Sequence, residues 1–236
     1  MMTGLFLSDL HLFSRRSIGQ RLWDQNRISI SAAKSIVLGG DIFDVRWSQF
    51  DSLDETLNAA SDWLEKAMAL NPGASWVYLL GNHDCHPRMQ SLLSSLSSRY
   101  SNFAWSPDVW RIGSNVFLHG DVLDGLRYVG GLDRYREQFH DDKPNGLLSN
   151  LLYSAVLRTR LHGVVPRVLH ARRPTCQRLL EYLGSYDPDL LLGTRNIFFG
   201  HTHVPMAGYR FDRFQFHNTG SGIRYLSLAP ASFEMT

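Results

Sequence analysis

Five short apolar runs, each ending at a glycine or serine beside Asp, Asn or His, most strongly constrain how this 236-residue chain can fold. The runs lie at residues 4–8, 35–39, 76–81, 115–120 and 196–200. Their length and their Val, Ile, Leu and Phe content predict β-strands. Because ligands of α/β sheets bind at the carboxyl ends of the strands, polar residues remote in sequence can converge there.

Helical patterns separate several of these runs. From Leu53 to Ala67, leucine and alanine recur at spacings of 4, 3, 4 and 3, which predicts a helix over 52–69 with one apolar face. Ser52 and Glu55 predict a capping box at its start, and a weaker pattern predicts a helix over 87–98. Alternating strands and helices indicate an α/β architecture with a largely covered sheet.

The interval from residue 122 to residue 195 contains no convincing strand. At about 75 residues it is far longer than an ordinary connection, so we expect 122–195 to be a helical cap or insertion within one domain that spans 1–236. Its middle, 151–178, combines arginines and apolar residues with no Asp or Glu. A substrate cap and a solvated helical hairpin with its own small core both fit this pattern.

Composition narrows the class of protein and its compartment. With 44% hydrophobic and 19% charged residues, and no apolar run near the roughly 20 residues of a membrane-spanning helix, the chain resembles a soluble globular protein. Its start lacks the basic segment and cleavage site of a signal peptide. Two cysteines, Cys85 and Cys176, cannot form a disulfide framework for a domain this size, so we expect a reducing, cytoplasmic location.

Five motifs stand at the ends of the predicted strands, in the order SDLH (8–11), GGDIFD (39–44), GNHD (81–84), HGD (119–121) and GHTH (200–203). Any one of them alone also fits a polar loop. Together they indicate a metal site, because carboxylates bridge cations, imidazoles bind Mn, Fe or Zn, and asparagine adds a neutral oxygen. Two divalent ions about 3.5–4 Å apart would activate a water and clamp a phosphate ester. We therefore expect hydrolysis with two ions, Mn first and Fe or Zn as alternatives.

The ordered motif set D-x-H, G-D-x-x-D, G-N-H-D, H-G-D and G-H-x-H resembles the calcineurin-like metallophosphoesterase superfamily over nearly the whole chain. The resemblance implies a two-sheet β-sandwich flanked by helices with a dinuclear metal site. It implies that His83 contacts the phosphate and can protonate the leaving oxygen, with Asp44 orienting its ring. The metal ligands that it implies are Asp9, His11 and His203 for one ion, Asn82, His119 and His201 for the other, and Asp41 as the bridge.

Within the superfamily, the layout is similar to the UDP-2,3-diacylglucosamine diphosphatases of lipid A biosynthesis. The shared features are SDLHL at the start, HGD followed by a long helical segment, GHTHVP, and NTGS at 218–221. Those enzymes release UMP and leave a lipid phosphate. The resemblance implies this reaction here, with peripheral contact to the inner face of an anionic membrane left open. Arginines of the long segment would bind the diphosphate; they are Arg158, Arg160, Arg167, Arg172 and Arg173.

Other functions stay open as alternatives. The lipid hydrolases commonly carry Arg where this chain has His83, so a soluble phosphodiester or dinucleotide is an alternative substrate. An inactive scaffold of the same fold is a further hypothesis, disfavoured because every expected ligand is present. A nuclease could use the arginines, but few aromatic residues interleave with them and the net charge is only +2, so we expect no nucleic-acid partner. The oligomeric state is not predicted.

Overall fold

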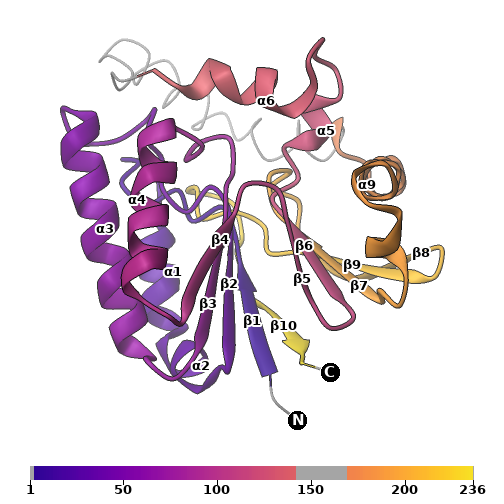
Figure 1. Cartoon of the computed structure of the whole chain (residues 1–236), viewed down its shortest axis with the longest axis horizontal. Helices are drawn as coiled ribbons and strands as arrows, with labels where there is room; N and C mark the ends of the chain where they lie inside the picture. The colour runs from indigo at the N-terminus through magenta and orange to yellow at the C-terminus, as the bar shows by residue number, and fades with distance from the viewer. Residues whose placement is uncertain (1–2, 142–168, 236) are drawn as a thin grey trace.

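Two five-stranded sheets face each other and carry helices on their outer sides (Figure 1). The computed structural model describes residues 3–141 and 169–235. The strand order is β10-β1-β2-β3-β4 in the first sheet and β5-β6-β7-β9-β8 in the second. The predicted α/β class and two-sheet sandwich flanked by helices are therefore confirmed.

The five predicted strands lie at the centre of the two sheets. They are β1 (Thr3–Leu7), β2 (Ser35–Gly39), β3 (Ser75–Leu79), β6 (Asn115–Leu118) and β7 (Asn196–Phe199). Within each sheet these strands run parallel to one another. The remaining strands were not predicted; they are β4 (Phe103–Ser106), β5 (Val109–Ile112), β8 (Met206–Phe211), β9 (Phe214–Asn218) and β10 (Ala231–Glu234).

The central strands are apolar on both faces because each sheet is covered twice. In β1, Leu5 and Leu7 belong to the core under the helices, whereas Phe6 belongs to the core between the sheets. Phe117 of β6 and Phe198 of β7 enter that same inner core from the second sheet, with ring centroids 5.0 Å apart. A strand that is buried on both faces reads as a continuous apolar run.

Helices α1 (Gly19–Gln25), α2 (Arg27–Ala32), α3 (Leu53–Leu70) and α4 (Pro87–Arg99) cover the outer face of the first sheet (Figure 1). The predicted helices 52–69 and 87–98 correspond to α3 and α4. Ser52 Oγ accepts a hydrogen bond from the Glu55 amide at 3.2 Å, as a capping box requires. The Glu55 carboxylate accepts from the Asp51 amide at 3.1 Å, one residue earlier than predicted.

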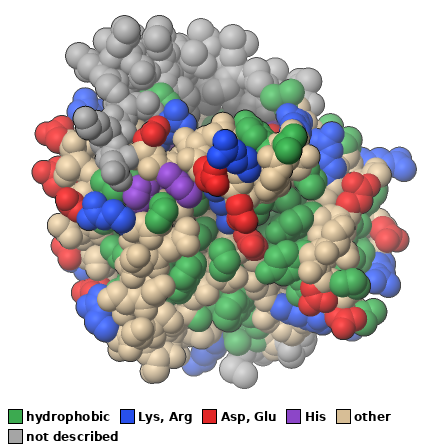
Figure 2. All heavy atoms as spheres, turned by 45° about the horizontal axis from the view of Figure 1, so that its top comes forward, with side chains coloured by type: hydrophobic (Ala, Val, Ile, Leu, Met, Phe, Trp, Pro, Cys, Tyr) green, Lys and Arg blue, Asp and Glu red, His purple; other side chains and the backbone are tan. Residues whose placement is uncertain are grey.

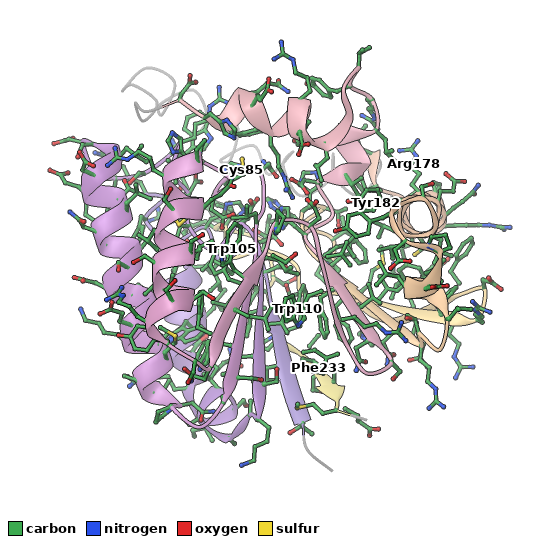
Figure 3. The ribbon with its side chains drawn as sticks, viewed as in Figure 1. Cys85, Trp105, Trp110, Arg178, Tyr182 and Phe233 are labelled. Atoms are coloured by element: carbon green, nitrogen blue, oxygen red, sulfur yellow. The ribbon has the colours of Figure 1, made fainter. Side chains whose placement is uncertain are left out.

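The described part of 122–195 is mostly helical. It contains α5 (Val122–Gly125), α6 (Gly131–Arg136), η1 (Glu137–Phe139), α9 (Arg172–Tyr186) and η3 (Pro188–Leu191). Helices α5 and α6 lie above the ends of the strands, whereas α9 covers the outer face of the second sheet (Figure 1). Figure 3 shows Tyr182 pointing from α9 toward that sheet. A single cap over 122–195 stays a prediction.

The parallel strands direct their carboxyl ends to one side of the sandwich. Strands β1, β2 and β3 of the first sheet and β6, β7 and β9 of the second all end below α5 and α6 (Figure 1). Among the described residues, none of the helices combines the length and apolarity that crossing a bilayer requires.

Candidate metal centre

Five of the predicted ligands have a left-handed backbone conformation in the turns that follow the strands. Their φ angles lie between 47° and 61°. Residues with a side chain rarely adopt this region, and holding one there costs on the order of 1–3 kcal/mol. Such strain is kept where the direction of a side chain matters. The five residues are Asp9, His11, Asp41, His201 and His203.

The first predicted ligand group comes together at the ends of β1 and β7. His203 Nε2 lies 3.3 Å from Asp9 Oδ1 and 3.1 Å from His11 Nε2. One ligand atom from each of the three residues lies within 4.8 Å of the other two. Two imidazole nitrogens and a carboxylate oxygen facing each other at these distances form a donor set that fits a divalent cation.

The second predicted group forms at the ends of β3, β6 and β7. His201 Nδ1 lies 3.0 Å from Asn82 Oδ1. His119 Nδ1 lies 2.9 Å from the Gly39 carbonyl oxygen, so this nitrogen carries the proton and donates it. His119 Nε2 is buried, has no hydrogen-bond partner among the described residues, and lies 3.4 Å from Asp41 Oδ2. An orphaned buried nitrogen beside a carboxylate fits a metal ligand.

Asp41 lies between the two groups. Its Oδ2 is 3.9 Å from His11 Nε2 and 3.4 Å from His119 Nε2. Asp9, Asp41 and His119 form another set of ligand atoms within 4.8 Å of one another, and His11, Asp41 and His83 form a third. A carboxylate in this position can be shared by two cations.

Glycines at the strand ends leave room for the carboxylates. A Cβ at Gly81 would lie 2.2 Å from Asp41 Oδ1, and one at Gly200 would lie 2.2 Å from Asp9 Oδ2. Both distances are far below van der Waals contact, so any side chain at either position would displace the carboxylate. The glycines of GNHD and GHTH are therefore part of the ligand geometry.

Charges in the cluster change one another's proton affinity. Burial opposes ionisation of Asp41, yet the neighbouring His119 and His83 hold the pKa of Asp41 well below its usual range. Burial likewise opposes a charge on His119, but Asp41 raises the pKa of His119 to about 10. A buried carboxylate that stays ionised attracts cations, whether protons or metals.

His83 and Asp44 form a pair at the edge of the cluster. His83 Nδ1 lies 3.0 Å from Asp44 Oδ1, and this oxygen also accepts from the Trp47 amide at 3.0 Å. Burial disfavours the charged ring, but Asp44 more than offsets this and raises the pKa of His83 to about 9. The His83 side chain is 20% exposed and that of Asp44 only 2%. The buried Asp44 therefore holds the inner edge of the ring, and the other edge faces outward.

Most of the predicted ligands are buried. Among the ring side chains, His119 and His11 are almost fully covered, and His203 is the most exposed at 22%. Accordingly, Figure 2 shows only a small histidine surface on this side of the described part.

Two carboxylates at the site had no predicted role, although Asp84 belongs to the GNHD motif. Asp84 accepts hydrogen bonds from the Tyr78 hydroxyl at 2.6 Å and from the Ile42 and Gly81 amides at 2.9 and 2.7 Å, and so fixes the GNHD turn. Asp124 Oδ2 lies 2.9 Å from His201 Nε2. For Asp124, the only hint in the sequence was that this carboxylate follows the HGD motif within one helical turn.

The structure describes two of the five arginines expected to bind substrate. Arg172 and Arg173 are exposed at the start of α9, and the Arg172 guanidinium carbon lies 5.7 Å from the Tyr209 ring centroid. The other predicted arginines lie outside the described residues; they are Arg158, Arg160 and Arg167.

A groove of about 820 Å³ opens beside the ligand cluster. The starts of β8 and β10, the end of β9, and Arg172 line it. A smaller pocket of about 400 Å³ shares Arg172 and Pro205 with the groove and is also lined by His170. The His170 ring centroid lies 6.1 Å from that of His201. Both pockets thus lie beside the segment that follows His203, and the larger one lies between the edge strands β8 and β10.

Comparison with models of protein families gives a match. Residues 2–205 match the family model of the calcineurin-like phosphoesterases. No curated protein matches the chain. The matched range contains both ligand groups, Asp41 and the pair of His83 and Asp44.

Proposed function

The chain belongs to the calcineurin-like phosphoesterases, which are metal-dependent hydrolases of phosphoester bonds. We propose that it cleaves the diphosphate of UDP-2,3-diacylglucosamine or of a related nucleotide-linked lipid. The products are UMP and a lipid phosphate. Cytoplasmic location belongs to the same proposal.

Both ligand groups support the catalytic part of the proposal. Two divalent ions, Mn first and Fe or Zn as alternatives, would be held by the two groups described above with Asp41 between them. When bound, such ions activate a water and neutralise charge on the phosphate.

His83 would protonate the leaving oxygen. Its Nδ1 is engaged by Asp44, which leaves Nε2 for the substrate. The partly exposed ring and the raised pKa suit a general acid, because the imidazolium form is the one that donates a proton.

The groove is the observation that favours a lipid substrate. Its wall contains the apolar residues Met206, Leu228 and Pro230. A polar wall residue, Asn218, already donates its amide to the Gly200 carbonyl at 2.8 Å and accepts from the Gly220 amide at 2.9 Å. Such a surface suits an aliphatic chain better than a polar ligand.

Arg172 supports the diphosphate part of the substrate. It lies at the rim that the groove shares with the smaller pocket, between the apolar wall and His170. A guanidinium at this junction can bind a phosphate oxygen while the acyl chain extends into the groove.

Peripheral contact with an anionic bilayer also belongs to the proposal. The loop that joins α5 to α6 exposes Leu126 and Val129, with exposed fractions of 54% and 98%. Arg127 lies between them in sequence and Arg134 follows in α6, and both arginines are exposed. Apolar and basic side chains together favour the surface of an anionic membrane.

Release of UMP tests the substrate. We expect Mn²⁺-loaded protein to release UMP from UDP-2,3-diacylglucosamine in mild detergent, detected by mass spectrometry, with no release after EDTA treatment. Ala207→Trp should fill the groove and raise KM for this substrate, whereas Ala32→Trp, exposed at the end of α2, is the matched control. No release from a sample with verified metal content would contradict the lipid substrate.

A soluble phosphodiester or dinucleotide is the second candidate. The pair of His83 and Asp44 favours it, because a general acid of this kind does not depend on an acyl chain. It predicts turnover of a soluble dinucleotide without detergent, with a KM that Ala207→Trp leaves unchanged.

A further inference from the structure

We propose that Asp124 is a positioning residue that holds the His201 ring in the orientation and tautomer in which Nδ1 can bind a cation. The inference rests on the proposed function, because it takes His201 and Asn82 as ligands of one ion. Asp124 lies in α5, three residues after the HGD motif.

The His201 ring is contacted at both nitrogens. Nε2 lies 2.9 Å from Asp124 Oδ2, and Nδ1 lies 3.0 Å from Asn82 Oδ1. A neutral imidazole has a single N–H group, so it can donate to only one of these two oxygens. The carboxylate is the stronger acceptor because it is charged, so the proton resides on Nε2.

This tautomer leaves two acceptors facing each other. The Nδ1 lone pair of His201 then points at the Asn82 carbonyl oxygen 3.0 Å away, an arrangement that is repulsive without a bridging proton or cation. A nitrogen and a neutral oxygen at this separation fit two ligands of one divalent ion. Asp124 therefore selects the nitrogen that the ion requires.

The backbone of His201 fixes the position of the ring but not its flip. The residue has a φ of 61°, and its amide donates to both oxygens of Asp9 at 3.0 and 3.1 Å. Rotation of the ring by 180° about the Cβ–Cγ bond would put Cδ2 in the place of Nδ1 and Cε1 in the place of Nε2 without moving the backbone. Among the described contacts of Nε2, Asp124 is the group that opposes this flip.

The carboxylate contributes little to the attachment of α5 itself. Val122 and Leu123 attach that helix to the core, with exposed fractions of 3% and 2%, whereas the Asp124 side chain is 28% exposed. A partly exposed contact of this kind contributes little to folding. Removing the Asp124 carboxylate should therefore leave the fold intact and change how the His201 ring is held.

Asp124→Ala is the direct test, with Asp133→Ala as a matched control. Asp133 is an exposed carboxylate in the neighbouring α6, so its loss changes the net charge equally. In metal-free protein, ¹⁵N NMR should show His201 as the Nε2–H tautomer in the wild type and Asp133→Ala, and as a mixture in Asp124→Ala. The His201 signal is assigned by its loss in His201→Gln.

Metal binding gives a second readout. Calorimetric titration with Mn²⁺ should show two ions in the wild type and in Asp133→Ala. In Asp124→Ala the affinity for one ion should fall about 10–100-fold while the other is retained, because outer carboxylates typically contribute that much. Asp124→Asn, which keeps an acceptor oxygen, should lose less.

The outcomes separate the two proposals. If the wild type binds two ions, and Asp124→Ala keeps both affinities and the wild-type tautomer, the positioning role is overturned and the metal centre stands. A wild-type protein that binds no divalent ion overturns the metal centre itself, and the role of Asp124 with it.

Discussion

His83 differs from the other histidines of the cluster in how its ring is held. Its Nδ1 bonds to the buried Asp44, and its amide donates to Asp41 Oδ1 at 2.8 Å. Both carboxylates therefore act electrostatically on the ring, while its Nε2 edge faces outward. This arrangement suits His83 to donate a proton, a role different from that of the histidines predicted to bind metal.

The pH dependence of metal-free protein should reveal this pair. Asp44 raises the pKa of His83 to about 9, above the unfolded value near 6.5, so the pair stabilises the fold below pH 6.5 and this contribution is lost as pH rises through 9. Asp44→Asn should lower the His83 pKa, measured by NMR titration, and should lose less stability in urea between pH 6.5 and 9.5. Equal His83 titrations in the two proteins would refute the assignment.

The predicted ligands were recognisable in the sequence because each lies within a few residues of a strand end in a known motif. Asp124 was not, since its partner His201 lies 77 residues away and no motif joins them. The left-handed backbone at the ligands was equally hidden, because residues other than glycine rarely signal it.

At the scale of elements, Arg136 at the end of α6 ties the segment above the strand ends to both sheets. Its guanidinium donates to Asp121, which follows β6, at 2.7 and 3.1 Å, and to Asp108, which precedes β5, at 2.9 Å. It also donates to the Leu80 carbonyl after β3 at 3.2 Å. Figure 3 shows Cys85 beneath the same helix, where it packs against the Arg136 backbone.

Arg136→Met should therefore destabilise the protein strongly. Removing one partner of a buried ion pair leaves Asp121 buried and uncompensated, at a cost of about 3–5 kcal/mol. Arg134→Met is the control, because Arg134 and its partner Glu137 are both exposed and the expected change is below about 1 kcal/mol. Urea denaturation measures both, and equal midpoints would show that Arg136 does not anchor the segment.

The elements that the sequence revealed are those covered on both faces, and the others had weaker signals. Strand β8 is half-exposed and has an irregular register around Gly208, where φ is 65°. Strand β9 alternates buried Phe214 and Phe216 with partly exposed residues, a pattern of period two that was overlooked. Strands β4, β5 and β10 have only four residues each, too few for a clear pattern.

At the scale of the whole molecule, the cluster spans the junction of the two sheets. Asp9, Asp41 and Asn82 follow strands of the first sheet, whereas His119 and His201 follow strands of the second. The bond from His119 to the Gly39 carbonyl joins the sheets at this point. Because the ligands meet only when the sandwich is assembled, metal binding should stabilise the folded state.

The most direct test compares the wild type with Asp41→Ala after reconstitution with Mn²⁺. It measures the metal content of each protein together with its turnover of bis(p-nitrophenyl) phosphate. The wild type should hold two ions per chain and turn over the ester. Asp41→Ala should lose tight binding of both ions and all measurable turnover. His83→Ala should keep two ions while its rate falls by about 10²–10⁴-fold. Asp41→Ala with two ions and wild-type turnover would contradict a shared centre built around Asp41.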